Sequence, residues 1–183
     1  AAAILREAEN ALIICGGGPV ISGAHEELYK VAELLEIPIA TTVSGQGAVA
    51  EHAPLALGVV GSNGGVPSTR QIVDASDVIL FIGCRAGSVT TERWRSPKPG
   101  VKIIHIDSDP DVIGANYKTD VGIVSDAKLA LAELSKCLKG AENRNNGLVR
   151  AASAWEAKVR DFTALATSSD SPIKPEAVIA ALM

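Results

Sequence analysis

Short apolar runs that alternate with helical patterns limit this chain to one class of fold. Each run contains four to six residues rich in Val, Ile, Leu and Ala, and a turn-forming or polar residue stands at its end or directly after it. Helical periodicity occurs over residues 22–36, where Ser22 is expected to be the N-cap, and over residues 67–74 and 126–139. This alternation predicts an α/β fold made of βαβ units around a parallel sheet. The six expected strands are residues 11–15, 37–42, 55–60, 77–82, 101–106 and 121–124.

The composition agrees with a globular domain and argues against two functional classes. Hydrophobic residues make up 47% of the chain but aromatic residues only 3%, so the core must consist of Ala, Val, Ile and Leu. The net charge of −4 argues against a dedicated nucleic-acid-binding protein, which would carry a basic face. No apolar run of roughly 18 residues occurs, so we expect no membrane span. The three cysteines form no CxxC pair, which indicates neither a zinc site nor a disulfide framework and favours the reducing cytoplasm.

A polar, turn-rich segment over residues 140–147 marks the expected end of the compact domain, near Lys139. The expected units are a nucleotide-binding-like domain of residues 1–140, a linker with a helix over residues 141–174, and the start of a further domain over residues 175–183. The chain has no initiator methionine, and residues 1–9 indicate an amphipathic helix rather than a signal peptide. We therefore expect the chain to be one part of a longer protein.

Ligands of open parallel sheets bind beyond the carboxyl ends of the strands, so the residues that follow each strand are the candidates for a site. Four of the six expected strands precede glycine-rich segments, and two precede acidic residues. Glycines let a backbone approach a ligand closely and leave N–H groups free for phosphate oxygens. Arg85 is suited to holding a phosphate, and Asp107 to accepting hydrogen bonds from ribose hydroxyls or an adenine amine. Together these residues predict a cleft for an extended nucleotide.

Several more specific motifs are absent. Residues 16–18 are glycines but the next one is Gly23, which breaks the spacing of the dinucleotide fingerprint, and the second strand ends in threonines rather than an acid. Both points argue against a nicotinamide dehydrogenase. Asp109, which precedes Pro110, is expected to cap a helix rather than to bind a metal, and His105 is expected to pack inside a strand. No nucleophile–base pair occurs, so we expect neither catalytic nor metal-ligating residues in this chain.

Six segments of the first 140 or so residues form an ordered set. They are Ala11-Leu-Ile-Ile-Cys-Gly-Gly-Gly18, Leu34-Leu-Glu-Ile-Pro-Ile-Ala-Thr-Thr42, Leu57-Gly-Val-Val-Gly61, Ala75-Ser-Asp-Val-Ile-Leu-Phe-Ile-Gly83, Val101-Lys-Ile-Ile-His-Ile-Asp-Ser-Asp-Pro110 and Asp126-Ala-Lys-Leu-Ala-Leu131. In this order they resemble the central domain of thiamine-diphosphate-dependent enzymes, the group that contains acetolactate synthase, pyruvate oxidase and oxalyl-CoA decarboxylase. The resemblance implies a six-stranded parallel sheet with helices on both faces, a Rossmann-like three-layer sandwich.

The resemblance also implies a set of cofactor-binding residues. Members of this family hold FAD, or ADP with part of a CoA ester, or no ligand in this domain. The FAD-binding synthases follow the position of Arg85 with a short stretch of acidic and basic residues, whereas this chain has Ala86-Gly-Ser-Val-Thr-Thr-Glu92. FAD and ADP/CoA are therefore both candidates, beside an empty cleft. The residues that match the family's nucleotide contacts are Gly16, Gly17, Gly18, Thr42, Gly83, Arg85, Asp107 and Asp126.

The catalytic apparatus of this family lies outside the central domain. The glutamate that activates thiamine belongs to an N-terminal domain, and the GDG motif for diphosphate and magnesium belongs to a C-terminal one; no GDG motif occurs here. The resemblance thus implies the middle domain of an acetolactate synthase-like 2-oxo acid decarboxylase or carboligase, inactive by itself. Its partners would be the other two domains, and the parent, with thiamine diphosphate and magnesium, would be a homodimer or homotetramer. The alternative is a nucleotide-binding module like those of electron-transfer flavoproteins or sirtuins.

Overall fold

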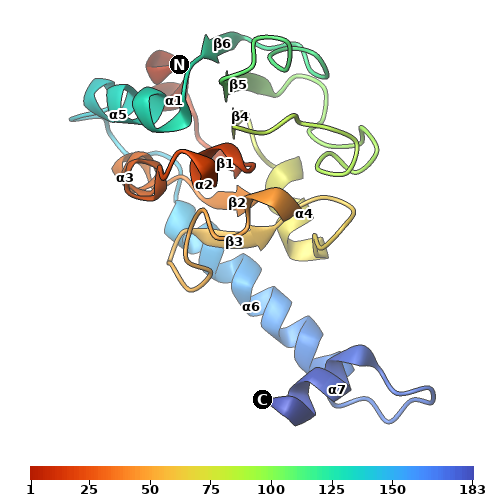
Figure 1. Cartoon of the computed structure of the whole chain (residues 1–183). Coiled ribbons are helices and arrows are strands. Elements are labelled where there is room, and N and C mark those ends of the chain that lie inside the picture. The colour runs from red at the N-terminus through yellow and green to blue at the C-terminus, as the bar shows by residue number, and fades with distance from the viewer.

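Six parallel strands form one sheet in the computed structural model, which describes residues 1–183 (Figure 1). The order in the sheet is β3-β2-β1-β4-β5-β6, and every neighbouring pair is parallel, as predicted. The order reverses between β1 and β4, and such a reversal opens a crevice at the carboxyl ends of these strands. The strands are β1 (Ala11–Cys15), β2 (Ile39–Thr41), β3 (Ala56–Val59), β4 (Val78–Ile82), β5 (Lys102–Asp107) and β6 (Val121–Val124).

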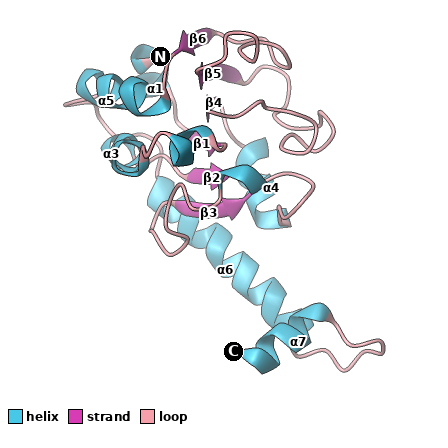
Figure 2. Cartoon of the chain, in the orientation of Figure 1, coloured by secondary structure: helices cyan, strands magenta, loops and turns pink.

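Helices cover both faces of the sheet, which confirms the three-layer sandwich (Figure 2). Side chains alternate along β1, so Ile13 joins the core under α1, α3 and α5, whereas Ile14 joins the core under α4 and α6. All five residues of β1 and of β4 are buried, because helices cover these central strands on both sides. The helices are α1 (Ala2–Glu7), α2 (Gly18–Ile21), α3 (His25–Leu35), α4 (Pro67–Asp74), α5 (Ala127–Cys137), α6 (Gly147–Ala166) and α7 (Pro175–Leu182), with a 3₁₀ turn, η1 (Val43–Gly45).

The segment after β1 differs from its prediction. Instead of one helix over residues 22–36, a single turn, α2, follows the glycines, and α3 begins at His25. Pro19 fixes a helical φ inside α2, and Gly23, with φ of 62°, ends that turn before α3 starts. The predicted N-cap at Ser22 is therefore wrong: its hydroxyl makes no hydrogen bond, and the N-cap of α3 is Ala24.

The helix predicted after Asp109 is also absent. The Asp109 carboxylate accepts a hydrogen bond from the Asp111 backbone N–H at 3.0 Å, which is the geometry of a cap, but the chain continues as turns rather than as a helix. Gly114, with φ of 76°, stands four residues after Pro110 and takes the backbone out of the helical region.

Helix α6 begins on the sheet and ends far from it (Figure 1). Ala151 and Ala154 are buried in the core shared with α4 and β3, whereas the second half of α6 contacts α7. The buried Asn145 accepts a hydrogen bond from the Ala11 N–H at 2.7 Å and donates one to the Leu35 carbonyl at 3.0 Å. The domain boundary near residue 140 stays a prediction, but the first turns of α6 pack as part of the same core.

Candidate functional site

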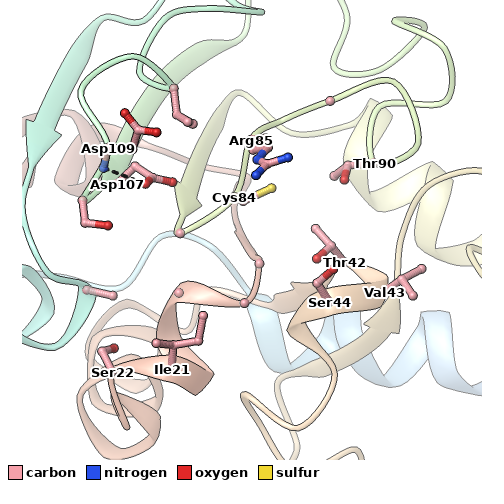
Figure 3. Close-up of a pocket in the computed structure, with 18 of the residues that line it drawn as sticks. Ile21, Ser22, Thr42, Val43, Ser44, Cys84, Arg85, Thr90, Asp107 and Asp109 are labelled. Atoms are coloured by element: carbon pink, nitrogen blue, oxygen red, sulfur yellow. Dashed lines mark hydrogen bonds between the residues drawn. The ribbon is translucent and has the colours of Figure 1, made fainter.

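A cleft of about 820 Å³ lies at the carboxyl ends of the strands, around the reversal between β1 and β4 (Figure 3). Its walls are the segments that follow β1, β2, β4, β5 and β6. The glycine-rich segment of residues 58–65, which starts within β3 and continues after it, does not line the cleft. This segment packs on the loop after β4 instead, where the Ser62 N–H donates to the Val89 carbonyl at 2.8 Å.

The cleft gathers every residue that the sequence proposes for cofactor binding. Sequence reasoning missed the residues that complete its rim, although each stands within a few positions of a predicted one. Among these are Ile21, Ser22, Val43, Ser44, Val89, Thr90, Ser108, Asp109 and Ser125. The proposed residues that line the cleft are Gly16, Gly17, Gly18, Thr42, Gly83, Arg85, Asp107 and Asp126.

Three of the glycines are required by the contact between the loops after β1 and β4. A side-chain carbon on Gly16 would overlap the Gly83 carbonyl oxygen, one on Gly18 would lie 2.6 Å from the Gly83 Cα, and one on Gly83 would overlap Gly18. A carbon on Gly17 would meet its first neighbour, the Ser44 carbonyl oxygen, at 3.4 Å. The two loops therefore touch backbone to backbone, and this packing accounts for Gly16, Gly18 and Gly83 without a ligand.

Arg85 lies between two chemically different sides of the cleft. Figure 3 shows it with Asp107 and Asp109 on one side and with Thr42 and Ser44 on the other. None of the seven salt bridges of the chain includes Arg85. Its guanidinium is thus a free cation in the middle of the cleft, where an anionic group of a ligand would be held.

Unused backbone donors accompany this cation. The N–H groups of Gly17, Cys84 and Arg85 donate to no acceptor in the chain, whereas those of Gly16 and Gly18 are bonded to the end of β4. Free N–H groups and a guanidinium are the donors that phosphate oxygens take in proteins. The centre of the cleft can therefore bind a phosphate or diphosphate.

One side of the cleft is acidic. Asp107 faces Val124 across the β5–β6 pair, so Asp126 lies at the same end of the sheet. The Asp107 carboxylate accepts from the Asp109 N–H at 3.0 Å, and the Asp126 carboxylate accepts from Lys128 and Leu129 as the N-cap of α5. Asp109 accepts in the same way from its own turn. Each carboxylate uses Oδ1 for these bonds, which leaves Oδ2 free to accept from a ligand hydroxyl or amine.

The other side of the cleft is uncharged. Val43, Ser44 and Val89 are exposed there, and Thr90 is half-buried. Thr42, one of the predicted residues, has its hydroxyl bonded to the Gly45 N–H at 3.2 Å, so it holds η1 in place. This side offers apolar surface and hydroxyl groups, which suit an uncharged organic group.

Two titratable groups lie at or next to the cleft: Cys84 lines it, and His105 contacts Cys84 without lining the cleft. Burial raises the pKa of the Cys84 thiol to about 11, so the thiol is protonated at neutral pH. Burial lowers the pKa of His105, and its Nε2 lies 2.8 Å from the Cys84 carbonyl oxygen. The buried, hydrogen-bonded His105 confirms the predicted packing role. A protonated thiol is a poor nucleophile, so Cys84 is not activated for attack on a ligand at neutral pH.

The cysteines provide a direct check of the burial of Cys84. We expect iodoacetamide at about pH 8 to modify the exposed Cys137 while Cys84 and Cys15, whose pKa burial raises to about 12, stay unmodified. Peptide mass spectrometry of the native chain measures this, and the chain unfolded in urea, where all three cysteines react, is the control. Labelling of Cys84 as fast as Cys137 would show that Cys84 is open to solvent.

No group of three or more His, Cys, Asp or Glu side chains is arranged to hold a metal ion. None of the helices combines the length and the apolar character that a membrane crossing requires.

Comparisons of the sequence with known proteins find relatives over almost the whole length of the chain. A family model described as "Thiamine pyrophosphate enzyme, central domain" matches residues 1–134. The chain is 40% identical over 190 residues to a protein named "Probable acetolactate synthase large subunit" from Methanococcus aeolicus, which covers 98% of this chain and 31% of that protein. A protein of the same name from Methanocaldococcus jannaschii is 38% identical and covers 100% of this chain.

A more distant relative shows the same pattern. An "Acetolactate synthase" from Mycobacterium bovis is 33% identical over 183 residues, with 98% of this chain and 29% of that protein covered. The chain therefore spans about 30% of the length of the relatives that it matches.

Proposed function

Because this chain belongs to the family of thiamine pyrophosphate enzyme central domains, we propose that its cleft holds the ADP part of a nucleotide cofactor such as FAD. The parent would be an acetolactate synthase-type enzyme that joins or cleaves 2-oxo acids, and this domain would anchor the cofactor and brace the subunit. The family match supports a central domain of this kind over the alternative that the sequence left open, a flavoprotein or sirtuin-like module.

The observation that carries the cofactor proposal is the chemistry at the centre of the cleft. Arg85 forms no ion pair, and the N–H groups of Gly17, Cys84 and Arg85 have no acceptor within the chain. Such unused donors cost free energy when they are shielded from water, and a ligand phosphate would satisfy them. The carboxylates of Asp107 and Asp126 would accept from the adenosine.

Thiamine diphosphate and magnesium belong elsewhere in the parent. When bound there, thiamine diphosphate supplies the carbanion chemistry that cleaves or joins 2-oxo acids. The residues of this chain do not fit that group, since no GDG motif and no cluster of metal ligands occurs among them. The residues of this chain would instead bind and orient the nucleotide cofactor and support the subunit.

The assembly and location of the parent are also proposals. We propose a homodimer or homotetramer in which this domain packs against N- and C-terminal domains of its own polypeptide. Exposed apolar side chains on α6 and α7, such as Trp155, Val159 and Ile179, suit such packing. The free thiols of Cys15 and Cys84 favour the reducing cytoplasm.

A second candidate function is a structural domain with an empty cleft. The glycine packing favours it, because Gly16, Gly18 and Gly83 are explained by contacts within the chain. The two candidates differ in what they require of Arg85. Only the cofactor-binding candidate provides a binding partner for its free guanidinium.

The test is a thermal-shift titration of the chain with ADP and with FAD. Ligand at 100 times its Kd stabilises the native state by about 2.7 kcal/mol, which for a chain of this size raises Tm by roughly 5 °C or more. Arg85→Gln should raise the Kd at least about tenfold, because a charge-assisted contact to phosphate is lost. Arg160→Gln, which changes an exposed arginine on α6, is the matched control and should leave the Kd unchanged.

Two outcomes would count against cofactor binding. No shift with either ligand at millimolar concentration would favour the empty cleft. A shift that Arg85→Gln and Arg160→Gln leave equally large would mean that the ligand binds outside this cleft.

A further inference from the structure

We infer that the cleft selects adenine nucleotides whose ribose carries no phosphate, and that the carboxylates of Asp107, Asp109 and Asp126 impose this choice. The inference rests on the proposed function and sharpens it, since FAD and ADP meet this requirement whereas CoA and NADP do not.

The charges of the cleft are divided between its centre and one side. Among the 22 residues that line it, Arg85 is the single Lys or Arg, whereas three aspartates gather beyond the ends of β5 and β6. None of these aspartates forms a salt bridge. Lys128, which follows Asp126 in the chain, pairs instead with Glu27 at 3.7 Å. The cleft thus offers one cation for one diphosphate, and no cation for a second phosphate.

The hydrogen-bonding capacity of the aspartates also disfavours a phosphate on the ribose. Each carboxylate accepts backbone N–H groups through Oδ1 and keeps Oδ2 free. An ionised carboxylate accepts hydrogen bonds and donates none. A ribose hydroxyl can donate to it, but a phosphate ester at that position removes the donor and adds negative charge. An acceptor–acceptor contact between like charges then replaces a hydrogen bond.

The orientation of a ligand follows from the same layout. With the diphosphate at Arg85, an adenosine on the side of Asp107 places its ribose near the free carboxylate oxygens (Figure 3). The reverse orientation would put the adenosine against Val43 and Val89, where no acidic acceptor for its hydroxyls lines the cleft. The uncharged side is left for the second half of a dinucleotide.

The probes are ADP and its analogue with an additional 3′-phosphate, which is the nucleotide part of CoA. Isothermal titration at low salt should give a Kd for 3′-phospho-ADP at least about tenfold above that for ADP, because close like charges oppose binding. Raising the salt to about 0.5 M should bring the two Kd values closer, since exposed charges are screened over a few ångströms there.

Replacement of the carboxylates by amides tests their part directly. Asparagine keeps the Oδ1 acceptor and remains a good N-cap, so the triple variant D107N/D109N/D126N should fold. It should reduce the preference for ADP over 3′-phospho-ADP to less than about threefold. A control with the same change in net charge, D161N/D170N/E176Q, alters acidic residues on or beside α6 and α7, remote from the cleft lining, and should keep the wild-type preference.

The outcomes separate this inference from the proposed function. A wild-type chain that binds both nucleotides equally retains the proposed function and overturns the selection against ribose phosphates. A preference that the triple asparagine variant keeps in full overturns the role of the three carboxylates. A chain that binds neither nucleotide overturns the proposed function and this inference with it.

Discussion

Alanine at Gly18 will lower the free energy of unfolding by about 3 kcal/mol, whereas alanine at the adjacent Gly17 will change it by less than about 1 kcal/mol. The added carbon at position 18 would lie 2.6 Å from the Cα of Gly83, a backbone atom that cannot move aside. At position 17 it would have ordinary contacts, and the φ of −71° there is one that alanine adopts readily. Urea denaturation of the two variants and the wild type measures the difference.

These two variants distinguish two reasons for a glycine-rich loop, ligand binding and packing between loops. If ligand binding were the reason for Gly18, its alanine variant would be as stable as the wild type and would lose only affinity. Equal midpoints of unfolding for Gly17→Ala and Gly18→Ala would therefore contradict the contact between the loops after β1 and β4. Because Gly17→Ala keeps its backbone N–H, its affinity for ADP reports only on the space that the methyl group occupies.

Alanine at Asn145 will destabilise the chain by about 2–4 kcal/mol, although the residue belongs to a polar turn far from the cleft. Its side chain connects the start of β1 to the end of α3 through the Ala11 N–H and the Leu35 carbonyl. The substitution leaves both backbone groups buried without a partner, and each such group costs about 1–3 kcal/mol. The free energy of unfolding from urea denaturation is the measurement.

Asn63→Ala is the control for this prediction. Asn63 is exposed in the loop after β3 and makes no hydrogen bond, so its loss should change the free energy of unfolding by no more than about 0.5 kcal/mol. Equal stability of the two variants would mean that the turn before α6 is not anchored to the sheet. It would then support a core that ends near residue 140.

The sheet was predictable because its central strands are buried on both faces. In β1 and β4 every residue is apolar, and such a run is visible without any knowledge of the neighbours. The turn α2 was not predictable from the sequence. Four residues are too few to show helical periodicity, and glycine with proline indicates a loop equally well. Asn145 carries no local signal at all, because its partner Ala11 lies 134 positions away in the chain.

The candidate site was predictable in outline for a topological reason. Parallel strands end at one edge of the sheet, so residues that follow β1, β4 and β5 must come together there. The same reasoning wrongly favoured the glycine-rich segment after β3, which stands at the edge of the sheet and packs on Val89 instead. The sequence could not predict which glycines are needed for packing, because this depends on how closely Gly18 and Gly83 approach each other.

The backbone contact between these two loops has a consequence for how such a domain can change its ligand. Where the main chains of the two loops touch there are no side chains to exchange, so a substitution cannot reshape this contact without disturbing the sheet beneath. Variation is left to lining side chains such as those of Arg85, Val43 and Asp109, which extend from loop backbones that are already fixed. A domain built in this way can acquire, exchange or abandon a cofactor through a few surface substitutions while its architecture stays the same.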